Sequence, residues 1–357
     1  MYKKENSTLI ITGSDVCTIV EKFGLDNIMD VLVRRLQLAI ENYDPKCIDI
    51  PIRSGFNYNT IYPGLIEWMP LHQQEKEIVI KVVGYHPNNP EHFKLPSILS
   101  SISSYDTQTG HLKGVADGVL LTALRTGAAS AVASRKMAIA ESTTLGLIGC
   151  GAQSITQLHA LSRIFNFKKV MINDIDETAM KSFKNRINML NLNLEIASSS
   201  ISNIVQEVDI LCTETAIEVG KGPLFLYEET NKKHLHINAI GSDFPGKIEL
   251  PVALLKKSFV CPDFLEQAKI EGECQQLTPE EIGPSLVQLI QNKTSYGHVK
   301  TELSVFDSTG WALEDQVVLE LFLDLAKEFN IGLNVHLEHI SSDVKNPYHF
   351  LLSSVEV

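Results

Sequence analysis

The sequence predicts an α/β protein in which a parallel-sheet unit is joined to a second, α+β unit built from both ends of the chain. Residues 144–175 indicate the parallel unit, because a short apolar run, a glycine turn, a helical apolar pattern and a second apolar run follow one another. Strand and helix patterns alternate from there to about residue 310. The second unit is indicated by an amphipathic helix over 25–43 that needs a partner, and by a final segment able to return to it.

The glycine turn carries the first functional signal. Gly149 and Gly151 follow the apolar run 145–148 and precede a helix, although Ser154 occupies the third glycine position of the usual motif. Glycines there let the backbone approach a pyrophosphate, and the helix N-terminus offers it unpaired N–H groups. Asp174 lies 23 residues beyond Gly151, where an acidic side chain can accept ribose hydroxyls. The stretch therefore predicts a dinucleotide site, the alternative being an αβ turn without a ligand.

Asp174 also bears on the choice of dinucleotide. Its carboxylate would repel the 2′-phosphate of NADP, and no arginine follows within the next several residues. The residue pattern favours NAD as the cofactor, while Lys181 keeps NADP open.

Composition bounds the remaining classes. The chain has 357 residues, 44% hydrophobic and 21% charged, with a net charge of −12, which argues against nucleic acid or an anionic membrane as a partner. No apolar run approaches the roughly 20 residues of a membrane span, and no signal peptide is evident, so a cytoplasmic protein is expected. The six cysteines and eleven histidines show no metal-ligand spacing, so no metal is predicted.

The N-terminal part is expected to form several strands, at 9–12, 65–69, 77–85, 97–104 and 115–119. Ser14 is expected to cap a helix, and 50–64 reads as a polar, turn-rich segment that carries Arg53. Lys81 interrupts the apolar run 78–83, which is expected to be buried on both faces. It lies either on a solvated edge or against a polar cavity.

Small residues recur at helical spacing over 124–134 and predict close packing against a neighbour, with Arg125 at the start of this segment. Later strands are expected at 192–198, 209–213, 236–240, 259–261 and 303–306, with a turn or helix at 204–208. Thr215 and Asp243 come just after two of them, where parallel sheets bind ligands. Asp243 has an alternative role as a turn cap beside Pro245.

The end of the chain returns to the beginning. A largely buried helix over 314–329 is expected, followed by a strand at 333–340 that rejoins the first unit. The predicted division is a substrate-binding and dimerisation domain (1–124), a dinucleotide-binding Rossmann domain (125–314), and a C-terminal return to the substrate domain (315–357).

Seven motifs, in this order, resemble the ornithine cyclodeaminase and mu-crystallin family, most of all its bacterial ornithine cyclodeaminases. They are IEWMP (66–70), KVVGYHP (81–87), LRTGAASAVA (124–133), LIGCGAQS (147–154), NAIGSDFPGKIEL (238–250), IEGECQQL (270–277) and VFDSTGWALEDQVVLE (305–320). The resemblance implies a nucleotide-binding domain inserted into a substrate domain, and a homodimer.

The resemblance also implies roles for individual residues. Arg53, Lys81 and Arg125 match the group that binds the substrate carboxylate, Thr309 matches a further substrate contact, and Asp243 matches the acid/base. Contacts to the cofactor match Ser97, Arg125, Thr126, Gly149, Gly151, Ala152, Gln153, Asp174, Thr215, Ile237, Asn238, Ala239, Ile240, Lys247 and Ser308. Glu67 is a further catalytic candidate that assists proton transfer, or equally a structural partner for Lys81 or Arg53.

The implied activity is the NAD-dependent conversion of L-ornithine to L-proline and ammonia, in which the hydride removed from the α-carbon is returned within one turnover. Phe244 replaces a cysteine of the ornithine enzymes, and the stretch 54–66 is longer than usual. Both changes lie toward the distal amine of the substrate. L-lysine, longer by one methylene and giving pipecolate, is therefore an alternative substrate.

Two other hypotheses stay open. A reductase of the same family, acting on cyclic ketimines or on an amine and a keto acid, would not need an acid/base at Asp243. A crystallin-like binding protein without chemistry would be expected to lack one of Arg53, Lys81, Arg125 or Asp243, and all four are present.

Overall fold

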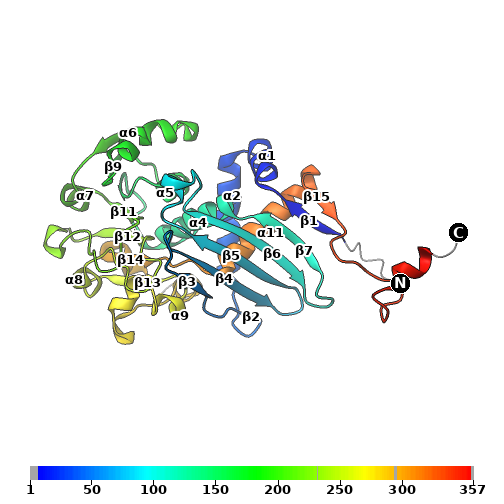
Figure 1. Cartoon of the computed structure of the whole chain (residues 1–357). Helices are drawn as coiled ribbons and strands as arrows, with labels where there is room; N and C mark the ends of the chain where they lie inside the picture. The colour runs from blue at the N-terminus through cyan, green and yellow to red at the C-terminus, as the bar shows by residue number, and fades with distance from the viewer. Residues whose placement is uncertain (1–6, 231, 293–295, 355–357) are drawn as a thin grey trace.

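The computed structural model describes residues 7–230, 232–292 and 296–354 (Figure 1). Two sheets organise this part of the chain, an eight-stranded mixed sheet and a seven-stranded parallel sheet. The predicted α/β class, with a Rossmann-type unit and an α+β unit built from both chain ends, is confirmed.

The first sheet has the order β15-β1-β7-β6-β5-β4-β2, with β3 also paired to β4. Its strands are β1 (Thr8–Ile11), β2 (Ile48–Asp49), β3 (Ser54–Tyr58), β4 (Gly64–Gln73), β5 (Glu77–Tyr85), β6 (Ile98–Asp106), β7 (Leu112–Asp117) and β15 (Leu333–Val335). The C-terminal strand β15 pairs with β1, as the predicted return requires. It ends at Val335 and does not continue to residue 340 as expected. Beyond it the chain runs away from both sheets (Figure 1).

Helices α1 (Gly13–Phe23) and α11 (Ala312–Phe329) pack on one face of this sheet, and α2 (Leu25–Glu41) packs against both of them. The apolar stripe of α2 is buried, which satisfies the need for a partner predicted from its pattern. The expected cap at Ser14 was wrong, because Thr12 precedes α1 and forms a capping box with Asp15. Each of these two side chains accepts a hydrogen bond from the backbone N–H of the other residue.

The opposite face of the first sheet is not covered by these helices. Along β5, Val79 and Lys81 point to the helices while Ile80 and Val82 point outward, and the outward Val82 is 40% exposed. Burial on both faces was therefore a wrong expectation, because an antiparallel sheet packs its core on one side only. Lys81 is 1% exposed on an interior strand, which excludes the solvated-edge interpretation.

The segment 50–64 was expected to be a polar loop, and part of it is strand β3. Five residue pairs join β3 to β4, from Ser54 opposite Trp68 to Tyr58 opposite Gly64. This edge strand is formed by backbone pairing with β4 and has no buried side chain of its own. Its sequence therefore lacks the alternation that identifies a half-buried strand.

The second sheet has the order β10-β9-β8-β11-β12-β14-β13, and all its strands are parallel. The strands are β8 (Thr144–Ile148), β9 (Lys169–Asn173), β10 (Glu195–Ser198), β11 (Ile210–Thr213), β12 (Leu235–Ala239), β13 (Phe259–Pro262) and β14 (Leu303–Asp307). Helices of this unit include α5 (Ala152–Ser162), α6 (Glu177–Arg186), α7 (Ile201–Glu207), α8 (Val252–Leu255) and α10 (Leu286–Gln291), and short α3 (Asn89–His92) and α9 (Leu265–Ala268) lie in connections. Strand order reverses between β8 and β11, and parallel sheets bind ligands at such a switch point.

The two units meet at α4 (Val119–Met137), which contacts α2, α5 and α11. Its small residues pack closely, as predicted. A Cβ on Gly127 would lie 2.6 Å from the Thr156 carbonyl oxygen of α5, so only glycine fits there. The predicted domain boundaries fall inside α4 and in the first turn of α11, and residues 1–6 and 355–357 of the outer segments lie outside the described residues. The division itself stays a prediction.

None of the helices in the described ranges combines the length and apolarity needed to cross a membrane.

Candidate active site

The three cations predicted to bind a carboxylate converge on the first turn of α11. Lys81 reaches it from β5, and its Nζ lies 2.9 Å from both carboxylate oxygens of Asp315. Arg125 reaches it from α4, with Nη1 2.7 Å from Glu314 Oε2 and Nε 3.3 Å from Asp315 Oδ1. All four side chains are buried, so each charge depends on the others for compensation.

Burial shifts the titration of this group. It lowers the pKa of Lys81 to about 8, an effect that the Arg125 charge strengthens and Asp315 opposes. It also raises the pKa of Glu314 to about 8, against the pull of Arg125. A Lys81 that titrates near neutrality is suited to exchange its partner for an incoming carboxylate.

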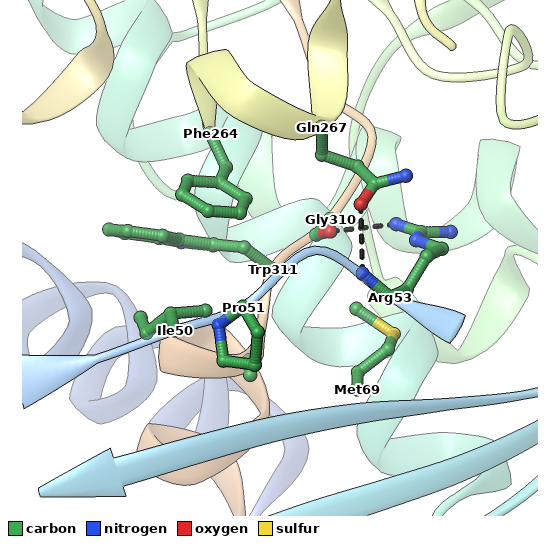
Figure 2. Close-up of a pocket in the computed structure, with 9 residues that line it drawn as sticks. Ile50, Pro51, Arg53, Met69, Phe264, Gln267, Gly310 and Trp311 are labelled. Atoms are coloured by element: carbon green, nitrogen blue, oxygen red, sulfur yellow. Dashed lines mark hydrogen bonds between the residues drawn. The ribbon is translucent and has the colours of Figure 1, made fainter. Parts of the chain in front are cut away.

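Arg53 approaches the same place from the segment before β3. Its Nη2 donates to the carbonyl oxygens of Thr309 (2.5 Å) and Gly310 (2.8 Å). A small pocket beside it is lined by Ile50, Pro51, Met69, Phe264, Gln267, Gly310, Trp311 and Ala312, and Gln267 accepts a hydrogen bond from the Arg53 backbone N–H (Figure 2). These contacts fix the guanidinium between the first sheet and the loop after β14.

Three carboxyl groups face the cations. Arg53 Nη1 lies 3.1 Å from Glu271 Oε1 and 3.8 Å from Glu67 Oε2. Burial raises the pKa of Glu271 to about 8, which Arg53 opposes and the charge of Asp243 reinforces. Burial also raises the pKa of Glu67. The bipolar site therefore joins Lys81 and Arg125, which pair with acids of α11, to Glu67 and Glu271, which Arg53 contacts.

Asp243 differs from these neighbours in its access to solvent. Its side chain is 37% exposed, against 3% for Glu271 and 19% for Glu67. The Lys247 ammonium lies 2.8 Å from Asp243 Oδ1 and 5.7 Å from the centre of the Tyr85 ring. The carboxylate is thus held in place by one ion pair while it remains open to water.

The glycine turn has the geometry of a dinucleotide site. Gly149 has φ 107°, and a Cβ there would lie 2.7 Å from the Glu214 carbonyl oxygen. The space beside Gly151 is open, and no side chain caps the N-terminus of α5. The two oxygens of Asp174 accept the backbone N–H groups of Cys150 (2.6 Å) and Asp176 (2.8 Å). Free helix N–H groups and an oriented carboxylate at the switch point fit a pyrophosphate and a ribose.

Other predicted cofactor residues lie around this crevice with their side chains held by neighbours. Thr215 donates its Oγ1–H and its backbone N–H to Glu249, at 2.6 and 2.7 Å. Ser308 Oγ donates to Asp263 (3.3 Å), which also accepts from Thr309 Oγ1 (3.1 Å). Thr126 Oγ1 donates to the carbonyl of Thr122, and Gln153 Oε1 accepts from Thr156 Oγ1.

The strand β12 and Ser97 are placed differently from this crevice. Ile237 is buried in the hydrophobic core, and Asn238 donates its amide to Ser134 Oγ (3.1 Å), so neither side chain is free for a ligand. Ala239 and Ile240 end the strand at the ligand-binding edge. Ser97 lies immediately before β6 on the first sheet, and its carbonyl accepts the backbone N–H of His86.

Three partners of the predicted cations were missed in the sequence, whereas Glu67, expected as an alternative to be a partner of Lys81 or Arg53, does lie 3.8 Å from Arg53. Glu314 and Asp315 fall inside a largely buried helix, and Glu271 lies in the IEGECQQL motif. Acidic residues in an otherwise apolar helical pattern were the available signal, because such residues are seldom buried without a partner. Within the part of the chain that the structure describes, no group of three or more His, Cys, Asp or Glu side chains is arranged to hold a metal.

The sequence matches a known protein family over most of its length. The family model described as ornithine cyclodeaminase/mu-crystallin matches residues 16–330. An L-lysine cyclodeaminase of Streptomyces rapamycinicus is 39% identical over 342 residues, covering 96% of this chain and 99% of that protein. An ornithine cyclodeaminase of Agrobacterium fabrum is 31% identical over 316 residues, covering 86% and 87%.

Solved structures agree. A lysine cyclodeaminase, studied for its recognition of L-lysine, L-ornithine and L-2,4-diaminobutyric acid, superposes with a TM-score of 0.92 at 41% identity, covering 96% of this chain and 99% of that one. An archaeal alanine dehydrogenase dimer with bound NAD gives 0.82 at 29% identity, covering 93% and 100%. The chain belongs to the ornithine cyclodeaminase/mu-crystallin family.

Proposed function

We propose that the protein is an NAD-dependent cyclodeaminase of linear α,ω-diamino acids, with L-lysine giving L-pipecolate as the first candidate and L-ornithine giving L-proline as the second. The bipolar site carries this proposal. The sequence alone pointed to L-ornithine first; the greater identity to an L-lysine cyclodeaminase supports the reversed order. One methylene separates the two substrates, which a pocket discriminates by only about 1–3 kcal/mol.

The cation side suits an α-carboxylate. Arg53 comes from the segment before β3, Lys81 from β5 and Arg125 from α4. Charge-assisted hydrogen bonds from such groups fix both the position and the plane of a carboxylate. A substrate carboxylate would take over part of the compensation that Asp315 and Glu314 now provide.

The acid side suits a distal ammonium. Burial raises the pKa of Glu67 and of Glu271, both of which lie near Arg53, and like-charge repulsion from Asp243 adds to both shifts. An ammonium group placed among them would relieve that repulsion. A diamino acid would add a further cation beside these carboxyl groups, which a substrate with a single amino group such as alanine cannot do, so the arrangement favours a diamino acid.

The chain's own residues would serve the chemistry as follows. When bound, NAD⁺ would supply reversible hydride transfer at the substrate α-carbon. The three cations hold the α-carbon in one orientation throughout. Asp243 takes a proton from the distal ammonium, which makes that nitrogen nucleophilic, and later protonates the departing ammonia. Glu67 assists these transfers from the neighbouring strand.

The cofactor residues are proposed from the crevice at the switch point. Gly149, Gly151 and the N-terminus of α5 would receive the pyrophosphate, and Asp174 the adenosine ribose. The buried side chains of Thr126 and Ser308 and the half-buried side chain of Thr215 are consistent with their predicted cofactor contacts.

A homodimer is part of the proposal. The outer face of the first sheet exposes Phe56 (69%), Ile66 (42%) and Val82 (40%), and the C-terminal segment 336–354 carries further exposed apolar side chains. Apolar side chains gathered on one face are typical of an interface. Light scattering should give twice the 39.6 kDa chain mass for the wild type and a single-chain mass for an Ile66→Asp/Val82→Asp variant. A wild-type monomer would contradict the dimer.

The function is tested by incubating the protein with a catalytic amount of NAD⁺ and L-lysine, L-ornithine or L-alanine. Ammonia and a cyclic amino acid formed in excess of the cofactor, without net NADH, are the expected result for a diamino acid. Pipecolate or proline then identifies the substrate. NADH consumption with a cyclic ketimine, and no ammonia from either diamino acid, would instead establish the reductase alternative; binding without any turnover would favour the crystallin-like one.

A further inference from the structure

Glu214 is a buried acid that the proposed chemistry does not use. It follows directly after β11, at the point where the strand order reverses toward β8. Both of its carboxylate oxygens are buried, and among the described residues neither has a hydrogen-bond partner. An unpaired buried carboxyl group costs folding free energy, so its position calls for a partner that the protein chain itself does not supply.

Glu214 lies beside the glycine turn, at the adenosine end of the proposed dinucleotide site. Its Cγ lies 3.3 Å from where a Cβ of Gly149 would stand. Burial raises the pKa of Glu214 well above its usual range, and the charges of Glu249 and Asp174 add to the shift. Burial raises the pKa of the Cys150 thiol in the glycine turn, and the charges of Asp174 and Glu214 add to this shift. Two carboxylate oxygens without a partner among the described residues can accept hydrogen bonds from the hydroxyl groups of a bound ligand.

Two cations of α6, Arg186 and Lys181, bind other partners. Arg186 donates to the carbonyl oxygens of Cys150 (2.7 Å) and Ala179 (2.8 Å), so it braces the turn. Lys181 pairs with Glu177 at 2.7 Å on the exposed surface of α6. Neither is placed as the arginine that commonly receives a 2′-phosphate.

We infer that Glu214 is a second carboxyl group for the adenosine ribose, which it binds together with Asp174, and that the pair makes the site select NAD over NADP. The inference rests on the proposed use of a dinucleotide. The ribose of NAD presents two hydroxyls to two carboxyl groups, one oriented by backbone N–H groups and one whose oxygens have no partner among the described residues. A 2′-phosphate would bring negative charge against both groups without a compensating cation.

The test is direct binding, measured by calorimetry on nucleotide-free protein with NAD⁺ and NADP⁺. Glu214→Ala should weaken NAD⁺ binding about tenfold, the typical cost of a hydrogen bond that involves a charged or partly charged group. Glu214→Gln keeps the shape and one oxygen acceptor but cannot carry a negative charge, so it should change NAD⁺ binding by less than about threefold and tighten NADP⁺ binding about tenfold. Circular dichroism and melting temperature verify that the variants fold.

Glu177→Gln is the matched control, because it also removes one acid near this end but from an exposed, paired position. It should leave the NAD⁺/NADP⁺ ratio unchanged. An equal shift in this control, or Glu214 variants with wild-type affinity for both nucleotides, would overturn the role of Glu214 while the proposed function stands. A wild type that binds neither nucleotide would overturn both.

Discussion

The proposed substrate side is built from buried charged side chains, whereas the proposed cofactor side is built mainly from open backbone. On the substrate side, buried charges from distant segments compensate one another, as Lys81 and Arg125 do with Asp315. On the cofactor side, glycine backbone and the uncapped start of α5 lie open, with Asp174 as the one oriented carboxylate. The substrate side therefore has to exchange partners when it binds, whereas the cofactor side only has to be filled.

This difference determines what a substitution does. A change in the charge network alters how the diamino acid is held or reacts and should leave nucleotide affinity alone. A change in the glycine turn should do the reverse. The variants below test that separation.

The largest effect is expected at the acid/base. Asp243→Asn cannot take a proton from the distal ammonium, so kcat/KM for the diamino acid should fall by about 10²- to 10⁴-fold. Calorimetry should show NAD⁺ affinity within twofold of wild type. Glu266→Gln, an exposed acid paired with Lys269, is the control and should keep full activity. A loss below tenfold at Asp243 would remove it from the acid/base role.

The next effect is expected at the carboxylate clamp. Arg53→Lys loses the fork that reaches the two carbonyl oxygens and Glu271 at once, so KM should rise about 10- to 100-fold, measured by initial rates at saturating NAD⁺. Arg35→Lys, in an exposed pair with Asp324, serves as the control. An unchanged KM with a reduced kcat would place Arg53 outside substrate binding.

A substitution at the turn should affect the other side. Gly149→Ala forces a positive φ on alanine and a contact with the Glu214 carbonyl, so it should cost about 1–3 kcal/mol of stability and weaken NAD⁺ binding about tenfold. Gly110→Ala, at φ 77° with no atom within 4 Å, separates backbone strain from the steric contact. Raised KM for the diamino acid at saturating NAD⁺ would show that the two sides are coupled.

The smallest effect is a pH dependence. The pKa of Lys81 is lowered from 10.5 to about 8, so the free enzyme loses this positive charge as pH rises through 8. The Lys81 contribution to kcat/KM should therefore be about fourfold lower at pH 8.5 than near pH 7. Lys81→Arg stays charged over this range and should lack the decline. Identical alkaline limbs in both proteins would assign the decline to another group.

The same contrast explains what could be predicted from the sequence. The strand, turn and helix of the dinucleotide unit follow one another in the sequence, so a local pattern predicts them. The structure has them at 144–162, as predicted. The charge network is not local, because Lys81 and Asp315 are 234 positions apart and no spacing rule connects them. The family resemblance predicted the cations. Their anionic partners Glu314 and Asp315 could not be predicted in this way, because they depend on how α11 packs.

Two errors in the first sheet have the same origin. Strand β3 exists because β4 offers it backbone partners, and its own side chains stay largely exposed. The apolar run around Lys81 was read as a doubly covered strand, whereas its outward side chains are open on one face. Both features depend on what lies across the sheet, which a single stretch of sequence does not specify.

The partial exposure of Asp243 has a kinetic meaning. Its neighbour Glu271 is only 3% exposed, whereas a side chain that is 37% exposed can exchange protons directly with bulk water. Under the proposed function, no internal relay is then required to reset Asp243 after each turnover. Viscosity and buffer concentration should accordingly have little influence on the recovery of the free enzyme.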